Sequence, residues 1–242
     1  KNLMKKYIKK GQVIIDCGSN IGFYPLLESK LVGDNGHLVC IEPDFRNYKL
    51  LQKNIALISD VKTDLFNIAI SDKKGTMSLD IGGPSNLNKI VRSDREIALN
   101  SVDVEVDTID NLMGKLHLKP DFIRMDIEGH EVEVLSGMRD TIKNAASGFV
   151  IFFELHPNEY DETHSLEGQL EFLYEEGFEC EVIVSAGEPI PALYKKLGYS
   201  PDMVIKTDNL ERGIYYNVNR KDSIKLATSL PKCSRYILLQ KK

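Results

Sequence analysis

Short apolar runs alternate along the chain with segments whose apolar residues recur at helical spacing. The runs at residues 12–16, 37–42, 65–70, 122–126, 149–155, 178–184 and 235–239 are expected strands. The segments 23–32, 45–58, 130–138 and 165–177 carry one apolar face at a period of about 3.6 residues, which predicts amphipathic helices. This alternation is typical of an α/β domain, in which helices cover a largely parallel sheet.

One part of the chain departs from that rhythm. Residues 76–81 and 102–106 alternate apolar and polar side chains, as half-buried strands do. We therefore predict a β-ribbon inserted over residues 73–110, with residues 82–86 as a loop. Residues 1–12 are expected to be a lead-in, and residues 185–225 an insertion on the substrate side. No linker composition interrupts the chain, which predicts a single domain over residues 1–242.

Composition narrows the class of protein. The chain has 31 Lys+Arg and 36 Asp+Glu, a net charge of −5, and 42% hydrophobic residues. This balance supports a buried core and argues against nucleic acid as a partner. No apolar stretch approaches the roughly 18 residues that a membrane-spanning helix requires. The four cysteines are spaced too widely for a zinc motif or a disulfide framework, so we expect buried thiols in a reducing, cytoplasmic compartment.

A glycine-containing turn joins the first expected strand to the first expected helix. Residues 16–22 read Asp-Cys-Gly-Ser-Asn-Ile-Gly. In open α/β sheets such turns bind nucleotide-like ligands, because glycine lets the backbone approach them closely. A tight turn without a ligand is the alternative interpretation. Asp16 would repel a pyrophosphate, but it suits the amino group of a cofactor that carries an amino acid.

Glu42 ends the second expected strand. A carboxylate in this position can accept hydrogen bonds from both hydroxyls of a ribose. Dinucleotide-binding folds place an acid comparably, so Glu42 alone does not distinguish one nucleoside cofactor from another. A solvated acid at a strand end is an equally compatible interpretation.

Three motifs together resemble the FkbM family of S-adenosylmethionine-dependent, class I methyltransferases. They are residues 14–22, the Ile-Glu-Pro at 41–43, and the stretch Asp-Phe-Ile-Arg-Met-Asp-Ile-Glu-Gly-His-Glu at 121–131 with Val-Leu-Ser-Gly at 134–137. The last is the most specific. The resemblance implies a Rossmann-like, doubly wound, seven-stranded, mostly parallel sheet with one antiparallel strand. It also implies methyl transfer from S-adenosylmethionine, usually to a hydroxyl of a sugar or natural product.

The same resemblance implies a role for each motif residue. The ribose would be held by Glu42, and the adenine edge by the turn that ends at Asp72, although Asp72 equally suits a plain surface turn. Asn20 stands where many class I enzymes have glycine. The residues expected to hold the methionine part are Asp16, Gly18, Ser19, Asn20 and Gly22.

Acidic and imidazole side chains follow two neighbouring expected strands. Asp126 and Glu128 follow the fourth, and Glu154 and His156 end the next. Methyl transfer to a hydroxyl needs a base, and an imidazole titrates near neutral pH, so His156 is the first candidate. Asp126, Glu154 and Glu128 are the further catalytic candidates. A backbone-bonding role for His156 and a helix-dipole role for Glu128 are the alternatives.

A divalent metal is a further, weaker expectation. Asp126, Glu154 and His156 are residue types that bind such ions, which acidify hydroxyls in some methyltransferases. No recognised metal-ligand spacing is present.

The sequence thus predicts an O-methyltransferase that acts on a hydroxyl of a sugar, glycan or natural-product acceptor. An NAD(P)-dependent oxidoreductase on the same kind of sheet is the first alternative. It is disfavoured because the glycine turn lacks a regular Gly-x-Gly-x-x-Gly pattern. A binding module that keeps the scaffold without catalysis is the second alternative.

Overall fold

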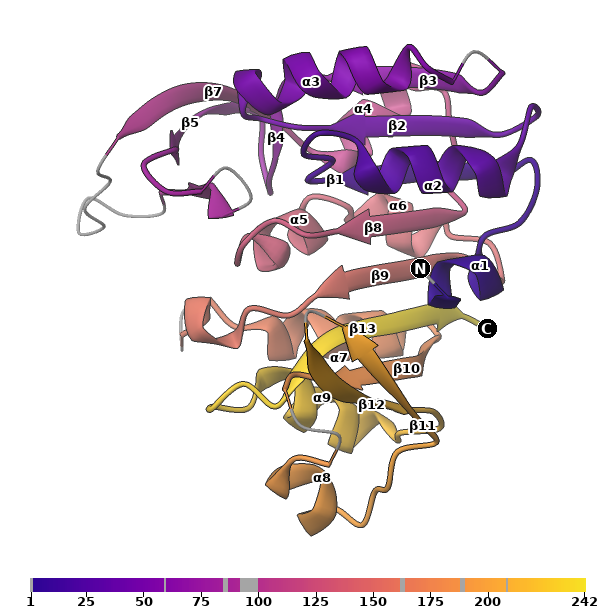
Figure 1. Ribbon diagram of the computed structural model, residues 1–242, viewed down its shortest axis with the longest axis vertical. Helices are drawn as coiled ribbons and strands as arrows, with labels where there is room; N and C mark the ends of the chain where they lie inside the picture. The colour runs from indigo at the N-terminus through magenta and orange to yellow at the C-terminus, as the bar shows by residue number, and fades with distance from the viewer. Residues whose placement is uncertain are drawn as a thin grey trace. The chain divides into compact units, whose positions relative to one another are not determined.

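The computed structural model describes residues 2–58, 60–84, 87–91, 100–161, 164–187, 190–207 and 209–242 (Figure 1). The chain divides into two compact units, residues 1–145 and residues 146–242, called unit 1 and unit 2 below. Each unit is described by itself. A single domain over residues 1–242 stays a prediction.

Unit 1 contains a parallel array of four strands in the order β3-β2-β1-β8. The strands are β1 (Val13–Cys17), β2 (His37–Ile41), β3 (Lys62–Phe66) and β8 (Phe122–Met125). All residues of β2 and β8 are buried, which accounts for their nearly continuous apolar sequence. In the register of β1 and β8, Asp16 lies opposite Arg124.

Three of the helices described in unit 1 match the predicted segments 23–32, 45–58 and 130–138, and the other three were not predicted. The described helices are α1 (Asn2–Tyr7), α2 (Phe23–Val32), α3 (Phe45–Ile55), α4 (Ile109–Leu116), α5 (Glu131–Ser136) and α6 (Arg139–Lys143). Helix α3 begins at Phe45 because the Asp44 carboxylate accepts a hydrogen bond from the backbone N–H of Arg46. Thr108 caps α4 in the same way.

The expected strand at residues 65–70 is wrong as a single element. β3 ends at Phe66, and β4 (Ala69–Ile70) belongs to a second sheet. Asn67 lies at the break, where its side-chain amide donates to the backbone carbonyls of Glu42 and Pro43, at 2.8 and 2.9 Å. These hydrogen bonds hold Asn67 against the end of β2, and the chain leaves the first sheet at this residue.

The second sheet of unit 1 contains the predicted ribbon. Its order is β4-β7-β5-β6, with β5 (Gly75–Asp80), β6 (Lys89–Ile90) and β7 (Ser101–Asp107). Strands β5 and β7 form the predicted ribbon, and they pair antiparallel. Their inward residues form a small apolar core with β4, which consists of Ala69, Leu79, Ile90, Val104 and Val106. Residues 85 and 86 of the predicted loop lie outside the described residues.

Unit 2 contains five strands in the order β9-β13-β10-β12-β11, and each pairing among them is antiparallel. The strands are β9 (Val150–Glu154), β10 (Phe178–Ser185), β11 (Met203–Thr207), β12 (Leu210–Tyr215) and β13 (Ser234–Lys241). The helices are α7 (Leu166–Glu175), α8 (Ala192–Lys196) and α9 (Arg220–Thr228). Strand β9 is buried along its whole length, as its run of Phe, Val and Ile predicts.

The α/β class is confirmed, but the predicted strand count and the single antiparallel strand are not. Among the described residues, four parallel strands in unit 1 and five antiparallel-paired strands in unit 2 exceed the expected seven. The excess arises in residues 185–225, which contain the hairpin β11–β12. No residue of β11 is fully buried, so its sequence carries no strong apolar pattern. That this segment lies on the substrate side stays a prediction.

Two structural observations concern the environment of the protein, one on membrane-spanning helices and one on the cysteines. No helix among the described residues is long and apolar enough to cross a membrane. All four cysteines are free and buried. Burial raises the pKa of the Cys17 thiol well above its usual range, so this thiol stays protonated.

Candidate functional site

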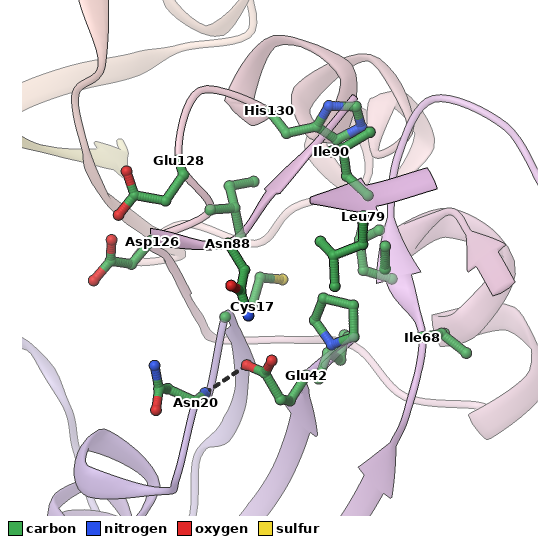
Figure 2. Close-up of a pocket in the computed structure, with 16 residues that line it drawn as sticks. Cys17, Asn20, Glu42, Ile68, Leu79, Asn88, Ile90, Asp126, Glu128 and His130 are labelled. Atoms are coloured by element: carbon green, nitrogen blue, oxygen red, sulfur yellow. Dashed lines mark hydrogen bonds between the residues drawn. The ribbon is translucent and has the colours of Figure 1, made fainter. Parts of the chain in front are cut away.

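A pocket opens in unit 1 at the carboxyl ends of β1, β2 and β8, beside the ribbon sheet (Figure 2). Its empty space measures about 600 Å³, and part of this space is open solvent. Figure 2 shows polar side chains of Asn20, Asp126 and Glu128 towards one end, and apolar Ile68, Leu79 and Ile90 towards the other. The lining residues are Cys17, Gly18, Asn20, Ile41, Glu42, Pro43, Ile68, Ala69, Ile70, Leu79, Asn88, Ile90, Asp126, Ile127, Glu128 and His130.

The glycine turn packs directly against the end of β8. Gly18 has a φ of +80°, and a Cβ atom there would lie 2.1 Å from the backbone oxygen of Asp126. Only glycine fits this position, because both the conformation and the space exclude a side chain. Asn20 is also left-handed, with a φ of 49°. At Gly18 the turn therefore presents backbone to the pocket.

Glu42 is a buried carboxylate on the pocket wall. One oxygen accepts a hydrogen bond from the backbone N–H of Asn20 at 2.7 Å, and the other from that of Asp44 at 3.0 Å. Burial raises the pKa of Glu42 to about 7, although these N–H donors oppose the rise. The carboxylate thus titrates in the physiological range and has lone pairs left for a ligand.

Arg124 connects the acids at the ends of β1 and β8. Its two terminal nitrogens donate to Asp16 and to Asp126, each at 2.7 Å. Its guanidinium also stacks over the Tyr24 ring, 3.8 Å from the ring centroid. Burial disfavours the charged form of Arg124, but the carboxylates outweigh it and raise the pKa above its usual range. No role for Arg124 was predicted from the sequence. Its partner Asp16 lies opposite it only because of the register between β1 and β8.

Glu28 belongs to helix α2, and it has no exposed surface. Neither of its carboxyl oxygens has a hydrogen-bond partner among the described residues. Burial, and after it the charge of Asp16, raises the pKa of Glu28 well above its usual range. The protonated, neutral form of Glu28 is therefore favoured.

His130 borders the pocket and is buried. Its Nε2 lies 2.9 Å from the Ser71 hydroxyl, and its Nδ1 lies 3.4 Å from a Glu133 oxygen. The neighbouring motif glycine, Gly137, packs on the same turn, because a Cβ atom there would lie 2.0 Å from the backbone oxygen of Ser71. The Leu-x-Gly part of the motif therefore has a packing role.

The sequence family described as "Methyltransferase FkbM domain" matches residues 16–180. The chain belongs to the FkbM methyltransferase family. The resemblance inferred from the motifs at residues 14–22, 41–43 and 121–131 is thus confirmed. Family membership also favours a methyltransferase over a nicotinamide-dependent oxidoreductase.

Solved structures with a similar fold include several methyltransferases. A putative rRNA-methylase from Clostridium thermocellum has 11% sequence identity and a TM-score of 0.47, with 99% of this chain and 92% of that chain covered. Fibrillarin from Aeropyrum pernix, in complex with natively bound S-adenosyl-L-methionine, has 10% identity and a TM-score of 0.44, with coverages of 96% and 68%. A SAM-dependent methyltransferase from Aquifex aeolicus has 17% identity and a TM-score of 0.41, with coverages of 89% and 87%. No curated protein sequence matches the chain.

The methyltransferase pocket brings together some of the predicted site residues. Gly18, Asn20, Glu42, Asp126 and Glu128 all line it. The other predicted cofactor residues are not among the lining residues, and these are Asp16, Ser19, Gly22 and Asp72.

Ser19 and Gly22 support the glycine turn, whereas Asp72 lies in the segment that follows β4. The Ser19 hydroxyl donates to the backbone oxygen of Asp16 at 2.9 Å. Gly22 packs on Leu51 of α3, 3.0 Å from the position of an added Cβ atom. Asp72 is exposed and lies 3.1 Å from the Ser71 hydroxyl. Direct contact of these residues with a cofactor stays a prediction.

The predicted catalytic residues Glu154 and His156 belong to unit 2. The Glu154 carboxylate lies 3.2 Å from Arg235 Nε and 3.6 Å from Lys232 Nζ. The backbone N–H of His156 donates to the Tyr160 hydroxyl at 3.3 Å, just before a 3₁₀ turn at Pro157–Glu159. A catalytic role for either residue stays a prediction.

Proposed function

We propose that this methyltransferase binds S-adenosylmethionine in the pocket of unit 1 and methylates a hydroxyl of a sugar, glycan or natural-product acceptor. The observation that carries the proposal is the pairing of the Glu42 carboxylate with an apolar wall in one pocket, beside a turn that only glycine can form at Gly18. A nucleoside needs both features, because its ribose donates hydrogen bonds and its base is flat and apolar on its faces. The residues present fit this cofactor.

The polarity of the pocket suggests an orientation for the cofactor. The base lies against Ile68, Leu79 and Ile90, and the ribose hydroxyls donate to Glu42. The methionine part then extends towards the backbone of Gly18 and the polar end near Asp126. Asp16 and Ser19 support the turn. Arg124 donates a hydrogen bond to Asp16, and the Ser19 hydroxyl bonds to the backbone at the ends of β1 and β2.

The chemistry requires a proton acceptor for the acceptor hydroxyl. The cofactor, when bound, supplies a methyl group on a sulfonium sulfur. We assign the proton to a ring nitrogen of His156, which accepts it while the hydroxyl oxygen gains the methyl group and S-adenosylhomocysteine is released. Asp126 and Glu128 orient the acceptor. His156 is favoured over these carboxylates because an imidazole can take up a proton at neutral pH.

A divalent metal ion bound by Asp126, Glu154 and His156 stays a weaker proposal. Of its predicted ligands, Glu154 is already flanked by the cationic side chains of Arg235 and Lys232. A divalent cation would have to compete with both, so we route no step through one. Activity assays with and without magnesium test this point. The net charge of −5 supports an uncharged or cationic small acceptor over nucleic acid.

Calorimetric titration with S-adenosylhomocysteine, with NAD as the control ligand, tests the function. We expect S-adenosylhomocysteine alone to bind. An acceptor screen across glycans and hydroxylated small molecules follows, scored by conversion of the cofactor. NAD binding, or no binding of either ligand, contradicts the proposal.

A further inference from the structure

Asn88, which lies just before β6 in the ribbon sheet, has a fixed amide orientation. Its Nδ2 atom donates to Asp44 Oδ2 at 2.7 Å. A carboxylate can only accept hydrogen bonds, and Arg46 holds the same Asp44 carboxylate in its ionised form. The amide nitrogen must therefore face Asp44, which leaves Asn88 Oδ1 facing elsewhere.

The side-chain oxygen of Asn88, Oδ1, is buried, and no described residue donates a hydrogen bond to it. Buried side-chain oxygens are almost always satisfied, so an exception calls for an absent donor. Asn88 lines the pocket together with Glu42, and Figure 2 shows its side chain extending into the group of lining residues. A bound ligand can supply the donor.

The surroundings of Asn88 indicate which part of a ligand this donor belongs to. Leu79 and Ile90, which pair across β5 and β6, line the apolar end of the pocket and come from the same sheet as Asn88. The strand-end acid Glu42 already serves the ribose in the proposed orientation. A planar base on the apolar wall leaves only its edge groups to reach an acceptor. The donor is then an N–H group on the edge of the base.

We propose that Asn88 Oδ1 accepts a hydrogen bond from the 6-amino group of the adenine base and makes the pocket selective for 6-amino over 6-oxo purines. This inference rests on the proposed function, in which the pocket holds the nucleoside of S-adenosylmethionine. The family resemblance implied that the turn at residues 69–72 holds the adenine edge. Ala69 and Ile70 of this turn line the pocket, whereas Asp72 does not. Asn88 is a specificity residue and takes no part in the chemistry.

The test compares two ligands and three proteins by calorimetry. The ligands are S-adenosylhomocysteine and S-inosylhomocysteine, which carries a 6-oxo group in place of the 6-amino group. We expect the wild-type protein to prefer the adenosyl ligand by roughly tenfold, the scale of one hydrogen bond to a buried acceptor. Asn88→Ala should bind the adenosyl ligand about tenfold more weakly and show little preference between the two.

Asn111→Ala is the matched control. The Asn111 amide also donates to an aspartate, Asp107, at 2.6 Å, but it lies outside the pocket lining. It should keep the wild-type preference. Thermal unfolding without ligand confirms that Asn88→Ala is folded, which we expect because Arg46 still pairs with Asp44.

Four outcomes would overturn the assignment. Equal affinity of the wild-type protein for both ligands contradicts it, and this result does not depend on any variant. An Asn88→Ala protein that keeps the preference, or that loses affinity equally for both ligands, places the contact elsewhere. If the wild-type protein binds neither ligand, the proposed function fails and this inference fails with it.

Discussion

Asp16 and Arg124 face each other in register across the parallel strands β1 and β8, and their side chains form a buried ion pair with a nitrogen–oxygen distance of 2.7 Å. Both side chains are almost inaccessible, with exposed fractions of 1% for Asp16 and 6% for Arg124. The pair fixes the start of the glycine turn relative to the end of β8. It couples the stability of unit 1 to the shape of the pocket.

Removal of the arginine should destabilise the protein strongly. Arg124→Met leaves the Asp16 carboxylate buried without its partner, so we expect the free energy of unfolding to fall by about 3–5 kcal/mol. Urea unfolding followed by circular dichroism measures this loss. Arg220→Met is the control, because Arg220 and Glu179 form an ion pair in which both side chains are exposed, and its loss should change little. Equal effects of the two substitutions would contradict the role of the buried pair.

Substitution of Gly18 should remove both stability and ligand binding. In Gly18→Ala the new Cβ atom would clash with the backbone oxygen of Asp126, so we expect a loss of at least about 1–3 kcal/mol in unfolding free energy and no measurable binding of S-adenosylhomocysteine. Gly75→Ala is the control, because nothing lies within 4 Å of its Cβ position. Thermal unfolding and calorimetry report the two effects separately. A Gly18→Ala protein with normal affinity would show that the turn does not shape the site.

The pKa of Glu42, about 7, predicts that ligand affinity depends on pH. The ionised carboxylate accepts hydrogen bonds from ribose hydroxyls better than the protonated form. Affinity for S-adenosylhomocysteine should therefore weaken as the pH falls through about 7, and Glu42→Gln should bind weakly at every pH. Calorimetry from about pH 6 to 8 tests this dependence. Glu105→Gln, at an exposed position of β7, should retain the wild-type profile.

Glu28 should make the protein less stable as the pH rises. Its pKa in the folded state lies well above the value of about 4.3 expected in the unfolded chain, so the folded state binds the extra proton. The free energy of unfolding then decreases with rising pH above about 4.3, by up to about 1.4 kcal/mol per pH unit. Glu28→Gln should remove this decrease and be more stable at pH 7. Urea unfolding of the wild-type and Glu28→Gln proteins over a pH series tests this dependence, with Glu105→Gln as the exposed control.

Replacement of His156 should separate binding from turnover. His156→Ala is expected to keep its affinity for S-adenosylhomocysteine and to lose about 100-fold in turnover, the usual scale of general-base loss. His117→Asn is the control, because His117 is exposed and has a φ of 54°, which asparagine tolerates. Normal turnover of His156→Ala would exclude it as the base. Activity with the acceptor found in the screen is the measurement.

Local sequence was sufficient for most core strands, for helices α2, α3, α5 and α7, and for the strand ends that border the pocket, but not for helices α1, α4, α6, α8 and α9. The bounds of α2 agree with its predicted range, because apolar spacing and the glycines at its ends are local signals. The alternation in β5 and β7 predicted a ribbon of half-buried strands for the same reason. Gly18 and Glu42 were singled out because they end buried strands, and the ends of adjacent parallel strands meet at one edge.

The tertiary structure decided which side chains actually meet. Arg124 pairs with Asp16 only through the register of β1 and β8, Glu28 becomes buried only when α2 packs on the sheet, and Asn88 reaches the pocket only because the ribbon folds beside it. The division of residues 65–70 into two strands likewise depends on the contacts of Asn67 with the end of β2. Helical and strand periods arise from the local backbone geometry, so the spacing of apolar residues close together in the chain is enough to predict them. Pairings between residues far apart in the chain depend on how the elements pack, which no local pattern encodes.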